Sequence, residues 1–172
     1  MIAKQLLLLR HAKSSWEDPE LADHDRPLAP RGRRAAKLIA KHLRRQGIAS
    51  ELVLCSSAAR TRETLELITP ALGEDVPVRI EDELYAASEQ VQLERVRAVA
   101  DGIESLLLIG HNPGIQQLAL LLAGGGENVA ALARKYPTAA LTTLEFNGRW
   151  RELGEGRAEL TGFVTPKELA SR

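Results

Sequence analysis

The chain contains the run Leu6-Leu7-Leu8-Leu9, which is followed directly by Arg10 and His11. In a strand, four consecutive leucines make both faces apolar, so this run is typical of a strand that is buried on both faces. Such a strand needs helices on both sides of its sheet, which indicates an α/β protein. Ligands of open α/β sheets bind beyond the carboxyl ends of the strands, so Arg10 and His11 are candidate site residues.

The rest of the chain alternates between short apolar runs, which predict strands, and longer amphipathic segments, which predict helices. The expected order is strand 6–9, helix 31–46, strand 51–55, helix 58–72, strand 76–80, helix 88–101, strand 106–109 and helix 113–122. We expect Gly124-Gly125-Gly126 to end the last helix or to form a mobile loop. Segments 138–146 and 149–153 are expected to form a hairpin that turns at Asn147-Gly148. The predicted fold is a three-layer α/β/α sandwich, mostly parallel, with an antiparallel edge strand.

Length and composition narrow the class of protein. With 172 residues the chain is about the size of one domain, and we expect a single domain over residues 1–172. The 23 basic and 23 acidic residues cancel, which excludes a globally basic nucleic-acid-binding protein. One cysteine, Cys55, excludes a disulfide framework and a multi-cysteine metal site. The apolar run 6–9 is too short for a signal peptide or a membrane span, so we expect a cytoplasmic protein.

Polar and cationic residues follow three of the expected strands. They are Arg10 and His11 after the first, Ser56, Ser57 and Arg60 after the second, and His111 and Asn112 after the third. If these strands are neighbours, two arginines and two histidines converge on one site. Guanidinium groups bind phosphate oxygens in pairs, and a neutral imidazole can attack phosphorus to form a phosphohistidine. A second histidine can stabilise the transferring oxygens or move a proton.

Other interpretations fit parts of this pattern. A single histidine after a strand is commonly structural, but two of them, one beside an arginine, favour a functional site. Metal binding is an alternative because histidine is a common ligand, yet there is no HExxH motif and no carboxylate lies within four residues of His111. The segment Gly110-His111-Asn112-Pro113-Gly114 matches neither a GxGxxG nor a Walker A loop. A phosphate site is therefore favoured.

Three motifs taken together resemble the histidine phosphatase superfamily, which has the phosphoglycerate mutase-like fold. They are Leu8-Leu9-Arg10-His11, Ser56-Ser57-Ala58-Ala59-Arg60-Thr61-Arg62-Glu63-Thr64 and Ile109-Gly110-His111-Asn112-Pro113-Gly114. Segments 10–14 and 25–32 resemble the short branch that contains the phosphohistidine phosphatase SixA. The resemblance implies a phosphatase that needs no metal and no cofactor.

The resemblance also implies roles for individual residues. His11 would carry the phosphoryl group transiently, and Arg10, Arg60 and His111 would form the phosphate pocket. The usual glycine after the nucleophile is Ala12 here, a departure that fits the short branch.

Three further residues are weaker candidates. Lys13 and Asn112 could contact the substrate, the alternatives being a solvent-facing lysine and an asparagine that serves only the turn. Larger members of the family present an acidic proton donor from an insertion, and here the equivalent region is short. Glu83 is the best candidate for that donor and Asp82 the second, the alternative being a solvated loop.

The small size of the chain suggests an open site, which favours a macromolecular substrate. We expect phosphohistidine in a protein, for example a histidine-containing phosphotransfer protein in signal transduction. The alternatives are a small phosphate ester of a sugar or nucleotide, or a phosphate-binding regulatory domain without turnover. A nucleic-acid or membrane partner is not expected, and the chain is expected to be a monomer.

Residues 26–45 include eight basic residues and no acidic one. With Ala36, Ile39 and Leu43 facing the core, the cations would cover the exposed face of the expected helix. A solvated face is the simpler interpretation. A docking surface for an acidic protein partner is the alternative.

Overall fold

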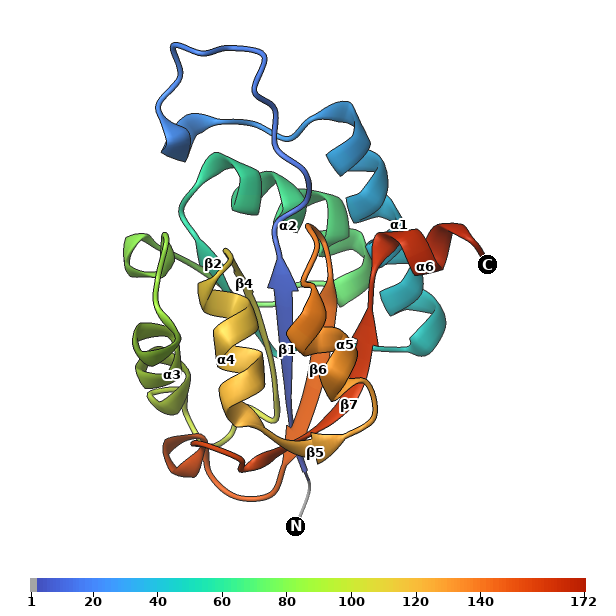
Figure 1. The fold of residues 1–172 in the computed structure, drawn as a ribbon. Coiled ribbons are helices and arrows are strands. Elements are labelled where there is room, and N and C mark those ends of the chain that lie inside the picture. The colour runs from blue at the N-terminus through green and yellow to red at the C-terminus, as the bar shows by residue number, and fades with distance from the viewer. Residues whose placement is uncertain (1–2) are drawn as a thin grey trace.

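The computed structural model describes residues 3–172 and shows one sheet between two layers of helices (Figure 1). The strands are β1 (Lys4–Arg10), β2 (Leu52–Ser56), β3 (Val78–Glu81), β4 (Ser105–Gly110), β5 (Ala123–Gly126), β6 (Leu141–Phe146) and β7 (Ala158–Val164). Their order across the sheet is β3-β2-β4-β1-β6-β7-β5. All are parallel to one another except β6, so the predicted mostly parallel α/β/α sandwich is confirmed.

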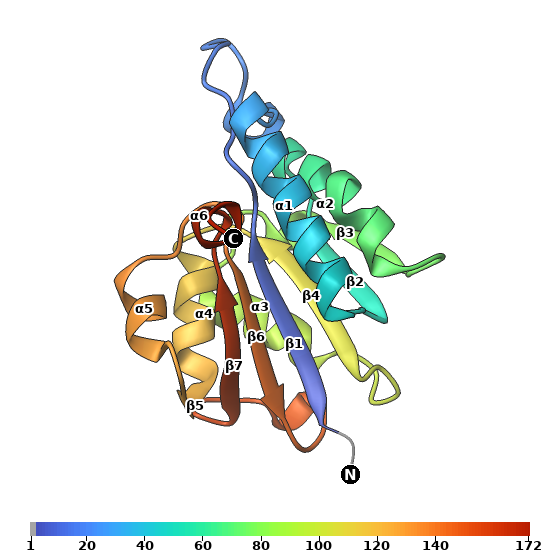
Figure 2. The ribbon, with the colours of Figure 1, turned by 90° about the vertical axis from the view of Figure 1, so that its right-hand side faces the viewer.

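The helices divide between the two faces of this sheet (Figure 2). One face is covered by α1 (Pro30–Gln46), α2 (Ala59–Leu72) and α6 (Pro166–Ala170), and the other by α3 (Glu89–Arg97), α4 (Gly114–Leu122) and α5 (Val129–Arg134). Short 3-10 helices are η1 (Asp23–Asp25), η2 (Asp82–Leu84) and η3 (Trp150–Glu152). Within residues 3–172, none of the helices has the length and apolar character needed to cross a membrane.

Strand β1 lies in the middle of the core. Its four leucines are each 0% exposed. Leu6 and Leu8 pack with α3, α4 and α5, whereas Leu7 and Leu9 pack with α1 and α2, because successive side chains of a strand point to opposite faces. Each buried leucine stabilises the fold by about 1.5–3 kcal/mol, so the run holds both helical layers to the sheet.

The register of the central strands determines which residues leave the sheet together. β1 pairs with β4 in parallel, with Leu9 opposite Ile109 and Arg10 opposite Gly110. On its other side β4 pairs with β2, and Cys55 is also opposite Ile109. The backbone N–H of His11 donates to the carbonyl of Gly110 at 3.1 Å. The three carboxyl ends therefore finish at one level, at the upper end of β1 in Figure 1.

The chain after β6 differs from the sequence prediction. The partner of β6 is β7, and residues 149–153, expected to be the second strand of a hairpin, contain η3 instead. The apolar residues of this segment, Trp150 and Leu153, are three positions apart and both are buried, a spacing that fits a helical turn and not a strand. The indole N–H of Trp150 donates to the carbonyl of Ile103 at 2.7 Å.

Two related expectations are corrected at the same edge of the sheet. The segment Gly124–Gly126, expected to be a helix end or a mobile loop, belongs to the edge strand β5, which runs parallel to β7. Glycines show no side-chain alternation, so this strand has no sequence signal. Because β7 and β5 extend the sheet beyond β6, the antiparallel strand lies inside the sheet and not at its edge.

The chain between β1 and α1 leaves the sheet and returns beside its own outgoing segment (Figure 2). Ser14 forms a bridge with Leu28, and the backbone N–H of Ala29 donates to the carbonyl of Lys13 at 2.9 Å. Gly32, in the first turn of α1, packs directly against the backbone of Lys13. A Cβ atom there would overlap the Lys13 carbonyl oxygen and lie 2.8 Å from its nitrogen. Only glycine allows this approach.

We predict that Gly32→Ala lowers the free energy of unfolding by about 1–3 kcal/mol, because an added methyl group in a filled contact forces the backbone apart. Urea denaturation measures the change. Gly102→Ala is the matched control, since a Cβ atom at Gly102 meets nothing within 4 Å. Equal stability of the two variants would contradict the close contact.

Candidate active site

A pocket of about 250 Å³ lies beyond the carboxyl ends of β1 and β4. The residues that line it are Arg10, His11, Lys13, Ser14, Trp16, Arg26, Arg60, His111, Asn112 and Thr138. The structure thus brings together six of the residues selected from the sequence: Arg10, His11, Lys13, Arg60, His111 and Asn112. Over residues 3–172, His, Cys, Asp and Glu side chains form no group of three or more that could hold a metal ion.

His11 is buried at the base of this pocket, with 7% of its surface exposed. Its Nδ1 lies 2.7 Å from the carbonyl oxygen of Ala12. A carbonyl can only accept, so Nδ1 carries the proton and Nε2 keeps its lone pair. Burial lowers the pKa of His11 to about 3; the hydrogen bond to Ala12 opposes this shift, and the charges of His111, Arg60 and Arg10 add to it. The imidazole is therefore neutral at pH 7.

His111 lies next to His11, with 5.3 Å between the ring centroids. Its Nε2 is 2.7 Å from the hydroxyl oxygen of Ser56, at the end of β2. Its Nδ1 is buried and has no hydrogen-bond partner among the described residues. Burial lowers the pKa of His111 to about 4, and the charge of Arg60 contributes further. His111 is therefore a second neutral imidazole beside His11, as expected from the pairing of Arg10 with Gly110.

Arg10 and Arg60 are fixed in place by hydrogen bonds from their terminal Nη atoms. Arg10 donates from Nη1 to the carbonyl of Tyr136 at 2.8 Å. Arg60 donates from Nη1 to the carbonyl of Asp23 at 2.8 Å and from Nη2 to its carboxylate at 3.0 Å. The Nε atoms of both are buried and have no partner in residues 3–172. A buried donor without an acceptor costs about 1–3 kcal/mol, and an oxyanion in the pocket is the kind of ligand that would satisfy both.

The contacts of Asp23 were not foreseen from the sequence. Its carboxylate, in η1, accepts hydrogen bonds from the Tyr85 hydroxyl and from Arg60. The Tyr85 contact is the largest cause of a pKa of about 2 for Asp23, with Arg60 and Arg26 also lowering it. Asp23 in turn raises the pKa of Tyr85. The polar segment around Asp23 has no periodicity, so no sequence pattern connects it with the first turn of α2.

The ring of Tyr85 contacts the rings of two histidines, His111 and His24. Its ring meets the ring of His111 edge-on, with centroids 5.4 Å apart. The ring of His24 also meets the ring of Tyr85 edge-on, with centroids 4.9 Å apart, and Nε2 of His24 is 2.9 Å from the hydroxyl oxygen of Ser57. The segment after β3 therefore contributes an aromatic side chain next to the pocket, and not a carboxylate.

Glu83, predicted as the proton donor, does not line the pocket, and neither does Asp82. Both are exposed in η2, where Leu84 is the residue inserted into the core, at 3% exposure. The carboxylate that contacts a pocket arginine is Asp23 instead. The structure thus does not bring the predicted donor to the site, because the turn that buries Leu84 leaves its two preceding acids in solvent.

Residues 6–88 match the family described as the histidine phosphatase superfamily (branch 1). The structure assigned as the phosphohistidine phosphatase SixA of Nakamurella multipartitia is 32% identical, with a TM-score of 0.80 over 96% of this chain and 98% of that chain. The chain belongs to the histidine phosphatase superfamily. The SixA-type structure from Agrobacterium tumefaciens is 30% identical, with a TM-score of 0.82 over 95% of this chain and 98% of that chain.

Among sequence relatives, the uncharacterized protein Rv1276c of Mycobacterium tuberculosis is 40% identical over 163 residues, which cover 92% of this chain and all of the relative. The similarity to SixA-type structures places the chain in that branch of the histidine phosphatase superfamily. This histidine phosphatase is accordingly a hydrolase that acts on a phosphorylated substrate.

The lowered pKa values predict that the rings of His11 and His111 stay neutral between pH 8 and pH 5. An ordinary histidine has a pKa of about 6.5 and would be mostly protonated at pH 5. NMR of ¹⁵N-labelled histidine in phosphate-free buffer measures each ring. Below about pH 6.5 the unfolded chain binds protons that these two folded rings do not, so the free energy of unfolding should decrease as the pH falls. Titration of either ring near pH 6.5 in the folded protein would contradict the burial.

Proposed function

We propose that this phosphatase removes the phosphoryl group from phosphohistidine in proteins, through a phosphohistidine intermediate on His11 and without a metal ion. The observation that carries the proposal is the neutral, buried imidazole of His11, whose Nε2 keeps its lone pair beside two arginines. The solved structures at 32% and 30% identity, both assigned as phosphohistidine phosphatases, support the same substrate class.

The reaction proceeds in two displacements. Nε2 of His11 attacks the phosphorus, a new P–N bond forms, and the P–N bond to the substrate imidazole breaks. The departing imidazole takes a proton from water at the open pocket. Water then attacks the phosphorus, the bond to His11 breaks, and inorganic phosphate leaves with His11 neutral again. The Nδ1–H of His11 stays hydrogen-bonded to Ala12 and holds the ring in its orientation.

The surrounding donors stabilise charge on the transferring oxygens. Arg10 and Arg60 each offer a free Nε–H, and their guanidinium groups keep their charge at neutral pH. Nε2 of His111 lies 2.7 Å from Oγ of Ser56, whose hydroxyl can donate to it. In the tautomer that accepts this hydrogen bond, the proton of His111 is on the buried Nδ1, where it is a third donor. Lys13 and Asn112 lie at the rim of the same pocket.

The acid–base character of the pocket favours a phosphoramidate over an alkyl phosphate ester. None of its lining residues is Asp or Glu, and the nearby Asp23 is ionised at pH 7 because of its pKa of about 2. An alkyl ester needs a strong proton donor for its departing alkoxide, whereas the ring of phosphohistidine can take a proton from water on its other nitrogen and leave as neutral imidazole. A site without a protonated carboxyl group is therefore better matched to phosphohistidine.

We predict a covalent adduct on His11. A ³²P-labelled phosphohistidine peptide, mixed with the enzyme in EDTA and quenched rapidly, should label the wild-type protein with an acid-labile, base-stable group. The His11→Ala variant should carry no label. A label on serine, or an unchanged label on His11→Ala, would remove the nucleophile from the proposal. Labelling by small phosphate esters but not by the peptide would reject phosphohistidine as the substrate.

We also predict that Arg60→Ala lowers kcat/KM by roughly 100- to 1000-fold, the usual cost of losing a donor to the transition state. Arg62→Ala is the matched control on the same helix. Its side chain is exposed, donates to the carbonyl of Ser57, and does not line the pocket. Steady-state kinetics of both variants measure the difference, and equal small losses would show that Arg60 does not bind the phosphoryl group.

A further inference from the structure

A second and larger cavity lies beside the active-site pocket. It has a volume of about 760 Å³, and we call it the α1–α6 groove. It is lined by α1, by α6 with the residue before it, by the segment before β6 and by one residue of the loop after β1. The lining residues are Lys13, Arg31, Arg34, Ala35, Lys37, Leu38, Pro137, Thr138, Thr165, Pro166, Lys167 and Ala170.

The floor of the groove is apolar. On α1 the residues at positions 31, 34, 35 and 38 form a single helical stripe, in which Ala35 and Leu38 are half-buried and follow the exposed Arg31 and Arg34. Pro137 and Pro166 face them from the other elements and are also half-buried. The groove therefore offers apolar surface of the kind that takes the apolar side of a helix or an extended segment.

The rim of the groove is cationic and unpaired. Its five basic residues are Lys13, Arg31, Arg34, Lys37 and Lys167. In the part of the chain that the structure describes, none of them forms an ion pair. Arg33, on the same helix but outside the groove, pairs with Glu63 at 3.4 Å. Lys41, Arg44 and Arg45, on the same helix but outside the groove, form no ion pair within residues 3–172 either, so the rim is distinguished by the apolar floor that it encloses.

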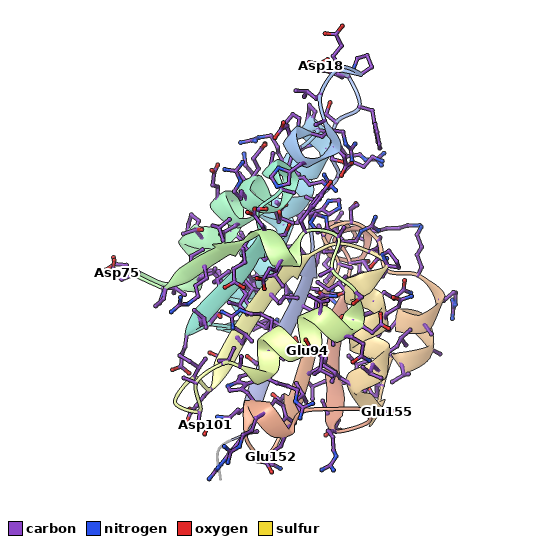
Figure 3. The ribbon with its side chains drawn as sticks, turned by 90° about the vertical axis from the view of Figure 1, so that its left-hand side faces the viewer. Asp18, Asp75, Glu94, Asp101, Glu152 and Glu155 are labelled. Carbon is purple, nitrogen blue, oxygen red and sulfur yellow. The ribbon has the colours of Figure 1, made fainter. Side chains whose placement is uncertain are left out.

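None of the residues that line the groove is acidic. The protein has no net charge, so this cationic rim reflects an uneven distribution. Glu94 lies on α3, and Asp101, Glu152 and Glu155 lie near the opposite end of the sheet from the loop that carries Asp18 (Figure 3). The one acid of α6, Glu168, does not line the groove and accepts a hydrogen bond from Thr165.

The groove adjoins the active-site pocket. Lys13 and Thr138 line both cavities, so a segment next to a residue bound in the pocket lies within reach of the groove. The groove is about three times the volume of the pocket (760 against 250 Å³) and carries four cations beyond Lys13. One phosphoryl group needs neither that space nor that charge.

We propose that the α1–α6 groove binds an acidic, amphipathic segment of the substrate protein that adjoins its phosphohistidine. Carboxylates of the segment pair with the cationic rim, and its apolar side chains cover Ala35 and Leu38. This inference rests on the proposed function. Charge complementarity at such a rim raises the rate of association and makes it dependent on salt.

Three phosphohistidine peptides test the proposal. All carry the phosphohistidine at the centre and leucines at helical spacing in the flanks, and the other flanking positions are Glu, Gln or Lys. At low ionic strength we expect kcat/KM for the Glu peptide to exceed that for the Gln peptide by about tenfold, with the Lys peptide lowest, and the ratio to fall as salt is added.

Two triple variants of α1 locate the effect. Arg31→Gln, Arg34→Gln and Lys37→Gln together should reduce the ratio between the Glu and Gln peptides to about one. Lys41→Gln, Arg44→Gln and Arg45→Gln remove the same charge from exposed positions of the same helix outside the groove and should keep the ratio. Thermal melting confirms that both variants fold. If the first is unstable, its three single variants should each lower the ratio in part.

The possible results separate this inference from the proposed function. Equal rates for the three peptides, or a ratio that survives in the groove variant, would overturn docking and leave the phosphohistidine activity in place. Faster hydrolysis of decyl phosphate than of methyl phosphate, with no preference among the peptides, would assign the groove to the apolar tail of a small ester instead. No hydrolysis of any peptide by an enzyme that hydrolyses small esters would reject both proposals.

Discussion

The parallel pairing of β1 with β4 is the constraint on which the active site depends. Because Arg10 is opposite Gly110, the next residues on the two strands are His11 and His111, and they leave the sheet side by side. This register is held by apolar side chains on both faces of the sheet, all fully buried. A shift of one residue would turn every leucine of β1 to the opposite face and separate the histidines. Core packing and catalytic geometry are thus specified by the same residues.

The site combines buried neutral bases with fixed cations. Burial keeps both imidazoles uncharged, whereas a guanidinium group is not deprotonated in proteins, and those of Arg10 and Arg60 each donate to a backbone carbonyl. Asp23 adds a carboxylate to Arg60 and holds its guanidinium in place before any substrate binds. The side-chain entropy of Arg60 is therefore lost on folding and not on binding, which favours recognition of the substrate.

The sequence predicted strands and pocket residues correctly where the pattern of apolar residues was local and strong. The all-apolar runs at 6–9 and 106–109 predicted buried strands, and the residues after them include five pocket residues, because a strand end places its next residues at a known edge. The sixth, Arg60, follows the strand predicted at 51–55. The roles of those residues in catalysis remain predictions. The misplaced hairpin at 149–153 arose because Asn147-Gly148 is a strong turn signal, whereas the helical spacing of Trp150 and Leu153 is a weak one. Asp23 and Tyr85 are 62 residues apart and meet only through tertiary folding, so no local pattern connects them.

The contact between Gly32 and the backbone of Lys13 has a mechanical consequence. It ties the first turn of α1 to a residue two positions after His11, without space for either segment to slide. His11 and the cationic face of α1 consequently move as one body, and the separation between them is set when the protein folds. If the α1–α6 groove binds an acidic segment as proposed, a substrate reaches both only when its phosphorylated residue and that segment adopt this separation. Selectivity among phosphoproteins would then follow from the spacing within the substrate, not from any change of shape in the enzyme.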